Sequence, residues 1–176
     1  MANLKFIKKC IPLRPIVSAI EAPTYTLAIF LTDKLQSFVR NTLSFIKDSS
    51  NFILKIKQLH LNERDIMVNF DLVSLFTKIL VPETLDLISK LVDEETLNLI
   101  KICLTSTFFT YKGKFYEQME GTTMGSSLSP VVANIFMEHF ETLELNSFHL
   151  KPKSWFRFFD EKIVFGLMDK LPYIHF

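Results

Sequence analysis

A short apolar run, Ile66 to Val68, leads toward a single carboxylate, Asp71, and apolar residues resume directly after it. The pattern is typical of a β-strand that places an acid at its end, beside a turn. An acid in that position is suited to metal or phosphate chemistry. A simpler hypothesis stays open, because an aspartate at a strand end often caps the helix that follows. A metal site would require Asp71 to meet a second acidic stretch much later in the chain, which strongly restricts the fold.

That second stretch is Phe158 to Glu161, and it lies within a predicted hairpin. Aromatic and β-branched arms flank Asp160, Glu161 and Lys162, which form the predicted tip. A charged turn exposed to solvent is the alternative explanation. Pairing of this hairpin with the strand that ends at Asp71 would place the acids side by side. Two-metal nucleotidyl transfer needs such carboxylates from separate elements, converging on cations roughly 3.5–4 Å apart.

The chain has 176 residues, of which 48% are hydrophobic and 22% charged. This composition predicts one globular domain with a substantial core and argues against disorder. No apolar run reaches the roughly 18 residues needed to span a bilayer, and the N-terminus lacks the features of a signal peptide. Cys10 and Cys103 are too few for a disulfide framework or a four-cysteine metal site. We therefore expect an intracellular, reducing environment and no association with a membrane.

Charge is distributed unevenly along the chain. Residues 1–64 contain ten basic and four acidic residues, whereas residues 65–176 contain ten basic and fifteen acidic residues. A basic half and an acidic half are consistent with a polyanion-binding surface beside a cation-binding one. Ordinary solvated surface is the competing explanation.

The remaining segments predict a mixture of helices, strands and another hairpin. Helices are expected over 24–47, from Phe52, from Pro82, through 97–104 and from Pro130. Residues 15–17 are predicted as an edge strand, and residues 108–117 as a hairpin around Lys112 and Gly113. The strand before Asp71 is expected to be mostly buried, and most of the 18 Phe residues to lie in the core.

Four motifs occur in a defined order, and together they resemble reverse transcriptases. They are Arg14-Pro15-Ile16-Val17-Ser18, Phe70-Asp71-Leu72-Val73-Ser74-Leu75-Phe76-Thr77, the glycine-containing loop 121–130, and Phe158-Phe159-Asp160-Glu161. The wording is most similar to reverse transcriptases of Penelope-like retroelements, from Ile11 to Phe165. The resemblance implies an α+β fold, a right-hand polymerase palm with partial fingers, in which an antiparallel sheet packs against helices. Residues 1–64 would form the partial fingers and leading helices, and residues 65–176 the palm with the metal-binding motifs.

The resemblance also implies roles for the acids. Asp71 and Asp160 match metal-binding aspartates of the family, and Glu161 stands at the position of the second acid in its Asp-Asp pair. These three catalytic residues are expected to bind two Mg²⁺ ions, which Mn²⁺ can replace. The implied partners are an RNA template, a DNA primer and deoxynucleoside triphosphates. Nuclear localisation is expected if the chain is part of an active retroelement, and the oligomeric state is left open.

Five further residues match positions that bind the incoming nucleotide. Arg14 corresponds to the fingers arginine near the triphosphate, although an exposed arginine with no special partner is the alternative. Phe76 corresponds to the steric gate that collides with a ribose 2′-OH. Leu72 would offer its backbone carbonyl, while Met124 and Gly125 match the loop that packs on nucleotide and template.

Several features depart from the family pattern. Glu161 is one methylene longer than the usual aspartate, Lys162 replaces a small polar residue, and Ser127 stands where proline is usual. We expect Lys162 to compete electrostatically with the metals and to pair with Glu161. The match is lost after Phe165, so a thumb, a connecting region and an endonuclease are expected to be absent. Three functions remain in view: a reverse transcriptase core fragment, a catalytically degenerate retroelement remnant that at most binds nucleic acid, and a helical interaction module whose acids are structural.

Overall fold

The protein forms two compact units, each with its own hydrophobic core. The computed structural model describes residues 16–72, 74–147, 152–158 and 161–167. The first unit combines residues 1–39 with 74–137, and the second combines residues 40–73 with 138–176. Both units therefore contain segments from the predicted fingers range and from the predicted palm range. That functional division stays a prediction.

The first unit is mainly helical. It contains α1 (Tyr25–Leu35), the 3-10 helix η1 (Gln36–Phe38), α3 (Leu75–Lys78), α4 (Val81–Ser89), α5 (Glu94–Thr105) and the beginning of α6 (Leu128–Ser147). Apolar residues recur every three or four positions, so that each long helix buries one stripe. Fully buried side chains in the resulting core include Leu31, Leu35, Ile88, Ile100, Leu128 and Val132. In the described part of the chain, no helix combines the length and apolar character that membrane crossing requires.

Residues at the first turns explain where α4 and α5 begin. Pro82 lies in the first turn of α4, where its missing N–H removes no helical hydrogen bond. Asp93 caps α5, because its side chain accepts a hydrogen bond from Thr96 N at 2.8 Å. The helices predicted from Pro82 and through 97–104 are confirmed.

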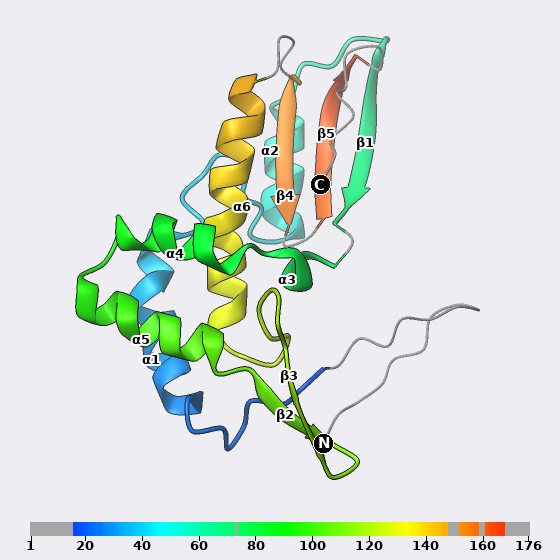
Figure 1. Ribbon diagram of the computed structural model, residues 1–176. Helices are drawn as coiled ribbons and strands as arrows, with labels where there is room; N and C mark the ends of the chain where they lie inside the picture. The colour runs from blue at the N-terminus through cyan, green and yellow to red at the C-terminus, as the bar shows by residue number, and fades with distance from the viewer. Residues whose placement is uncertain (1–15, 73, 148–151, 159–160, 168–176) are drawn as a thin grey trace. The chain divides into compact units, whose positions relative to one another are not determined.

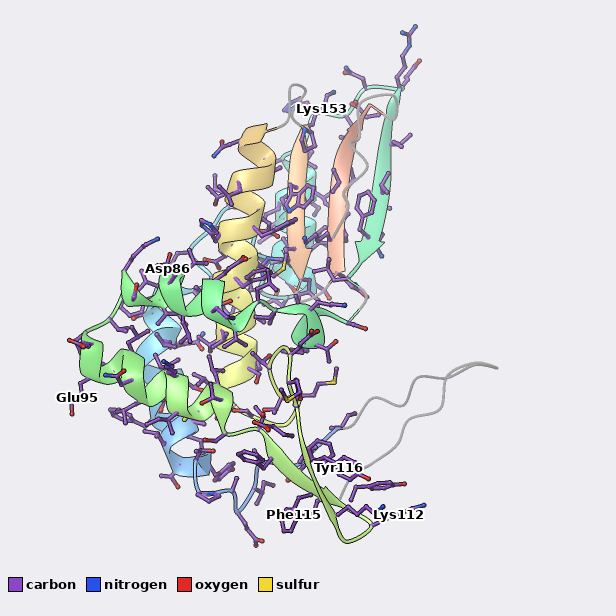
Figure 2. The ribbon with its side chains drawn as sticks, in the orientation of Figure 1. Asp86, Glu95, Lys112, Phe115, Tyr116 and Lys153 are labelled. Carbon is purple, nitrogen blue, oxygen red and sulfur yellow. The ribbon has the colours of Figure 1, made fainter. Side chains whose placement is uncertain are left out.

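A hairpin of β2 (Phe108–Tyr111) and β3 (Lys114–Glu117) completes the first unit. Its two-residue turn has left-handed backbone at Lys112 (φ 49°) and Gly113 (φ 74°), which suits the twist of the flanking strands. Phe115 is 83% exposed, and Figure 2 shows Phe115 and Lys112 projecting outward. The hairpin confirms the prediction, and among the described residues no third strand pairs with it.

The second unit is built on an antiparallel sheet in the order β1-β5-β4 (Figure 1). The strands are β1 (Asp65–Asp71), β4 (Ser154–Phe158) and β5 (Glu161–Leu167). Side chains alternate between the two faces of the sheet. Phe156 and Phe165 on one face pack with residues of α2 (Ser49–Lys57). Residues on the other face contact the part of α6 that belongs to this unit.

Three predicted elements differ in the structure. The helix expected over 24–47 ends at Leu35 and is followed by η1. Beyond η1, Val39 is extended, Arg40 adopts left-handed backbone (φ 66°), and Phe45 forms a bridge with Arg157 of β4, so the helix does not reach residue 47. β1 is not mostly buried, because it is an edge strand and Met67 is 63% exposed. The edge strand predicted at 15–17 is described only in part: Ile16 forms an isolated bridge, and Val17 has irregular backbone.

Candidate active site

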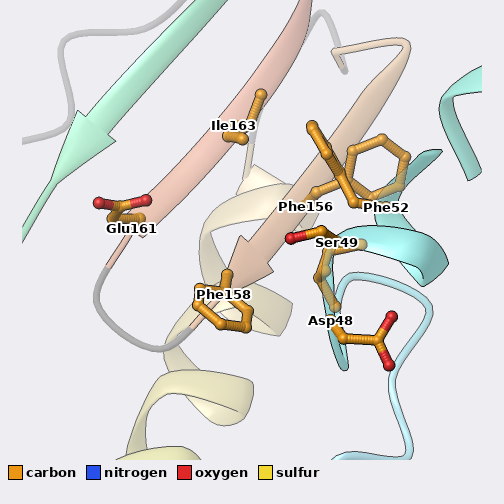
Figure 3. A pocket seen from close by; sticks show the side chains of 8 residues that line it. Asp48, Ser49, Phe52, Phe156, Phe158, Glu161 and Ile163 are labelled. Atoms are coloured by element: carbon orange, nitrogen blue, oxygen red, sulfur yellow. The ribbon is translucent and has the colours of Figure 1, made fainter.

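The two acidic stretches meet at one end of the three-stranded sheet. β1 ends at Asp71 and β5 begins at Glu161, and these two residues are register partners in the antiparallel pair. Residues directly opposite each other in such a pair have Cα atoms roughly 4.5–5.5 Å apart. Glu161 is exposed, and Figure 3 shows it at the start of β5. The sheet therefore brings together two acid positions from distant parts of the sequence.

The register is specified along the whole length of β1. Its residues pair without interruption with β5, from Asp65 opposite Leu167 to Asp71 opposite Glu161. A slip of one residue would exchange the two faces of the strand, which is unfavourable where one face is buried. After the strand, Ser74 adopts left-handed backbone (φ 67°) and α3 begins. The end of β1 is thus defined both by pairing and by the turn that follows.

The side chain of Lys162 does not pair with that of Glu161, contrary to the prediction. Both residues belong to β5 rather than to a turn, so their side chains point to opposite faces of the sheet. Lys162 is fully buried, and its Nζ lies 5.2 Å from the ring centroid of Phe140 and 5.4 Å from that of Trp155. The sheet separates the lysine charge from the face that carries Glu161.

A cavity of about 240 Å³ lies on the face of the sheet that carries Glu161. Aromatic and apolar side chains form most of its wall. The lining residues labelled in Figure 3 are Asp48, Ser49, Phe52, Phe156, Phe158, Glu161 and Ile163, and Ile46 completes the lining. Asp48 is the N-cap of α2, and its side chain accepts a hydrogen bond from Asn51 N at 2.8 Å. Such a wall suits a flat, partly apolar group placed next to the acid positions.

The other predicted site residues are distributed over the chain. Arg14 and Asp160 lie outside the described residues. Leu72, in the second unit, is buried directly after β1. Phe76, in the first unit, is half-buried in α3, and its backbone oxygen accepts a hydrogen bond from Thr122 N at 2.7 Å. The steric-gate candidate therefore lies against the glycine-containing loop.

Met124 and Gly125 occupy a turn within that loop. A Cβ on Gly125 would overlap the backbone oxygen of Val17, so only glycine fits without a shift of the backbone. Gly121 in the same loop also packs closely, and a Cβ there would overlap the backbone oxygen of Phe76. The loop thus contacts residues from two of the other motifs within the first unit.

Comparisons with known proteins place the chain in a family. A family model described as Reverse transcriptase (RNA-dependent DNA polymerase) matches residues 12–170. The chain belongs to the reverse transcriptase family. No curated protein matches the sequence significantly.

The reverse transcriptase fold is also similar to a solved structure, apo telomerase from Candida tropicalis truncated from its C-terminal domain. The TM-score is 0.58 at 13% identity, with 96% of this chain and 44% of the telomerase chain covered. At this identity the likeness shows a shared fold. The chain spans less than half the length of that telomerase chain.

Reverse transcriptase domains generally use divalent metals, and the acid end of the sheet fits such ions in its ligand chemistry. Carboxylate oxygens are the ligands that Mg²⁺ prefers. Asp71 and Glu161 provide two acid positions from separate strands in register. Within the described residues, no three His, Cys, Asp or Glu side chains form a cluster. The third predicted ligand, Asp160, lies outside them.

Two features of the site are not predicted by the sequence. Helical periodicity assigns no function to α2, yet its first residues line the cavity beside Glu161. The helix-capping pattern at Asp48 locates the start of α2 but says nothing of its neighbours. Arg157 is also overlooked, although an arginine inside an aromatic strand indicates a buried partner; it is 1% exposed and contacts Glu141.

Proposed function

We propose that this chain is the core of an RNA-directed DNA polymerase of the Penelope-like type, acting by two-metal nucleotidyl transfer. The observation that carries the proposal is the register pairing of Asp71 with Glu161 at the end of the sheet. Family membership supports polymerase chemistry. The wording of the motifs at 14–18 and 70–77 supports the Penelope-like subtype. The substrates are a DNA primer on an RNA template and deoxynucleoside triphosphates.

In this proposal, Asp71, Asp160 and Glu161 hold the divalent cations, Mg²⁺ or Mn²⁺. When bound, two such ions supply activation of the primer hydroxyl and neutralisation of the leaving pyrophosphate. The task of the protein is to present oxygen ligands from separate strands at a defined spacing. Backbone pairing between β1 and β5 sets that spacing independently of any ligand. The extra methylene of Glu161 extends the reach of its carboxylate beyond that of an aspartate.

The nucleotide would be handled by residues of the other motifs. Arg14 binds the triphosphate, Phe76 excludes a ribose 2′-OH, and Leu72 offers its backbone carbonyl. Met124 and Gly125 pack against the nucleotide and template. The close packing of the glycine-containing loop on the backbone of Phe76 and Val17 supports a shared role for these segments.

Primer extension on an RNA template, with Mg²⁺ and then with Mn²⁺, tests the proposal. We expect product from the unaltered chain, and a loss of roughly 10²–10³-fold or more in Asp71→Ala, because an electrostatic contributor to the transition state is removed. Asp86→Ala is the matched control, since Asp86 is an exposed acid paired with Lys90 on α4. Equal product from Asp71→Ala and Asp86→Ala would contradict the proposal.

The competing proposal is that the chain is a catalytically degenerate remnant. It is supported by Glu161, which stands where the family has an aspartate. A remnant predicts no product from the unaltered chain. Glu161→Asp should then restore extension, whereas Lys162→Thr alone should not, because Lys162 points to the opposite face of the sheet. Restoration by Lys162→Thr alone would contradict the geometry described here.

A further inference from the structure

Two buried cationic side chains lie directly opposite each other near the end of the β4–β5 hairpin that carries Glu161. Arg157 and Lys162 are register partners, and they are 1% and 0% exposed. Like charges placed opposite each other destabilise a sheet, and burial of charge is unfavourable unless the charge is paired. Their presence therefore requires compensation from an element that packs on this face.

Two carboxylates on α6 compensate Arg157. Its Nε lies 2.9 Å from Glu141 Oε1, and its Nη2 lies 3.5 Å from Glu138 Oε1. Glu141 is itself 3% exposed. Burial raises the pKa of Glu138, while hydrogen bonding from Arg40 N and the charge of Arg157 oppose that rise. The network therefore contains buried charges of both signs in close contact.

Lys162 is held in the same layer by aromatic rings. Its Nζ lies 5.2 Å from the ring centroid of Phe140 on α6 and 5.4 Å from that of Trp155 on β4. Desolvated cations at such distances are attracted to the faces of aromatic rings. Lys162, the second residue of the central strand β5, thus links this strand to α6 through Phe140 and to β4 through Trp155.

Residues 44–46, which precede α2, also contact Arg157 and Glu141. Ser44 Oγ donates a hydrogen bond to Glu141 Oε2 at 3.0 Å. Arg157 N donates to Ser44 O at 2.8 Å, and Ile46 N donates to Arg157 O at 2.9 Å. Both the backbone and the side chain of Arg157 are therefore fixed, and β4 cannot shift along its axis without breaking these contacts.

We propose that Arg157, held by Glu138 and Glu141, and Lys162, held by Phe140 and Trp155, are positioning residues that fix the start of β5 so that Glu161 remains opposite Asp71. Arg157 and Lys162 lie on the face of the sheet opposite to Glu161, so they do not contact the proposed divalent metal ions. Glu161 directly precedes Lys162 in β5, so a displacement of Lys162 moves Glu161 as well. The inference rests on the proposed metal site, whose ligands it positions.

The test uses a charge-free replacement of the central pair, Arg157→Met with Glu141→Leu. Replacing both members of a buried ion pair by apolar residues of similar volume is tolerated far better than removing one member. Lys162 and Glu138 remain, so the layer keeps one charge of each sign. Circular dichroism and thermal unfolding report whether the variant is folded, and Mn²⁺ titration followed by electron paramagnetic resonance reports metal binding.

The matched control is Lys153→Met with Asp65→Leu, which removes an ion pair at the other end of the same sheet. We expect the Mn²⁺ dissociation constant to rise roughly tenfold in the Arg157→Met, Glu141→Leu protein, the effect typical of residues that orient metal ligands. The control pair should leave it unchanged. A merely structural role for the network would lower the unfolding temperature without changing Mn²⁺ binding.

An unchanged Mn²⁺ dissociation constant in the folded Arg157→Met, Glu141→Leu protein would overturn the inference. If that protein does not fold, Lys162→Met takes its place, because it removes the other positioning charge and leaves an apolar side chain between the rings of Phe140 and Trp155. Unchanged Mn²⁺ binding in the folded Lys162→Met protein is equally decisive. Failure of the proposed function itself looks different: the unaltered chain would then bind no Mn²⁺ that Asp71→Ala removes. That result would overturn the metal site and the positioning role together.

Discussion

Two hairpins of similar composition have very different surroundings in this protein. Both have arms that contain aromatic and β-branched residues. All four residues of β3 in the first hairpin are exposed. The second hairpin, β4–β5, pairs with β1 and is covered on both faces. Correspondingly, Phe115 is 83% exposed and Phe156 only 7%.

The difference shows that a turn and its arms specify a hairpin locally, but not what covers it. Burial of β4–β5 depends on β1, α2 and α6, which come from distant parts of the sequence. Asp71 and Glu161 come together because β1, which is distant in sequence, pairs with β5 of this hairpin.

Removing one aromatic ring from each hairpin should separate them most clearly. Phe156 packs edge-to-face with Phe52 and Phe165, with ring centroids 6.0 and 6.1 Å apart. Phe156→Ala should therefore lower the free energy of unfolding by about 3–5 kcal/mol. Phe115→Ala should change it by less than about 0.5 kcal/mol. Urea denaturation of both variants measures the contrast, and equal destabilisation would show that the first hairpin is buried in solution.

A smaller effect is expected at the turn of the first hairpin. Gly113 has left-handed backbone (φ 74°), and a Cβ there would meet no atom within 4 Å. The cost of Gly113→Ala is therefore conformational alone, about 1–2 kcal/mol. Because this hairpin has no third strand among the described residues, the cost should appear as local opening. Hydrogen exchange should accelerate in β2 and β3 and stay unchanged in β4 and β5.

The smallest effect concerns pH and the far end of the three-stranded sheet. A hydrogen bond from Lys153, just before β4, lowers the pKa of Asp65 in β1, and Asn62 N adds to the effect. A lowered carboxyl pKa stabilises the fold above the ordinary Asp value, and the stabilisation is lost as pH falls through the depressed pKa. The unfolding midpoints of Lys153→Met and the unaltered chain should therefore differ at neutral pH. The difference should shrink only as pH falls below about 4, through the depressed pKa of Asp65.

Lys112→Met, at the turn of the exposed hairpin, is the control for this pH series. Its Nζ lies over the ring of Tyr111 at 5.4 Å. This contact involves no carboxylate, so the difference between Lys112→Met and the unaltered chain should stay constant over the same series, from neutral pH to below about pH 4. A parallel pH dependence in both variants would mean that the Lys153–Asp65 contact is not its source.

Local chemistry explains which elements the sequence predicts correctly. The proline in the first turn of α4, the apolar period of α5 and the Lys112-Gly113 turn each act within a few residues. The meeting of Asp71 with the second acidic stretch is also predicted, and the register confirms it for Glu161. That expectation came from the family resemblance and the chemistry of paired acids.

Long-range packing explains what the sequence could not predict. The turn was expected to include Glu161 and Lys162, so nothing indicated that strand alternation would turn Lys162 away from the acids. Phe content also does not predict burial: among the described Phe residues only Phe156 and Phe165 are buried, whereas Phe30, Phe38, Phe108, Phe115 and Phe158 are exposed. Hydrophobicity identifies residues that can be buried, whereas the neighbours available in space decide which of them are.

The uninterrupted pairing of β1 with β5 also limits how the length of this chain can change. Deletion of one residue from β1, with its first pairs retained, would move the acid from its place opposite Glu161 to a place opposite Lys162. An insertion would carry it past the end of the pairing. Substitutions in β1 leave the position of Asp71 intact, whereas insertions and deletions do not. The number of residues in β1 therefore determines where Asp71 lies relative to Glu161. Related sequences should vary in residue type along β1 while keeping its length constant.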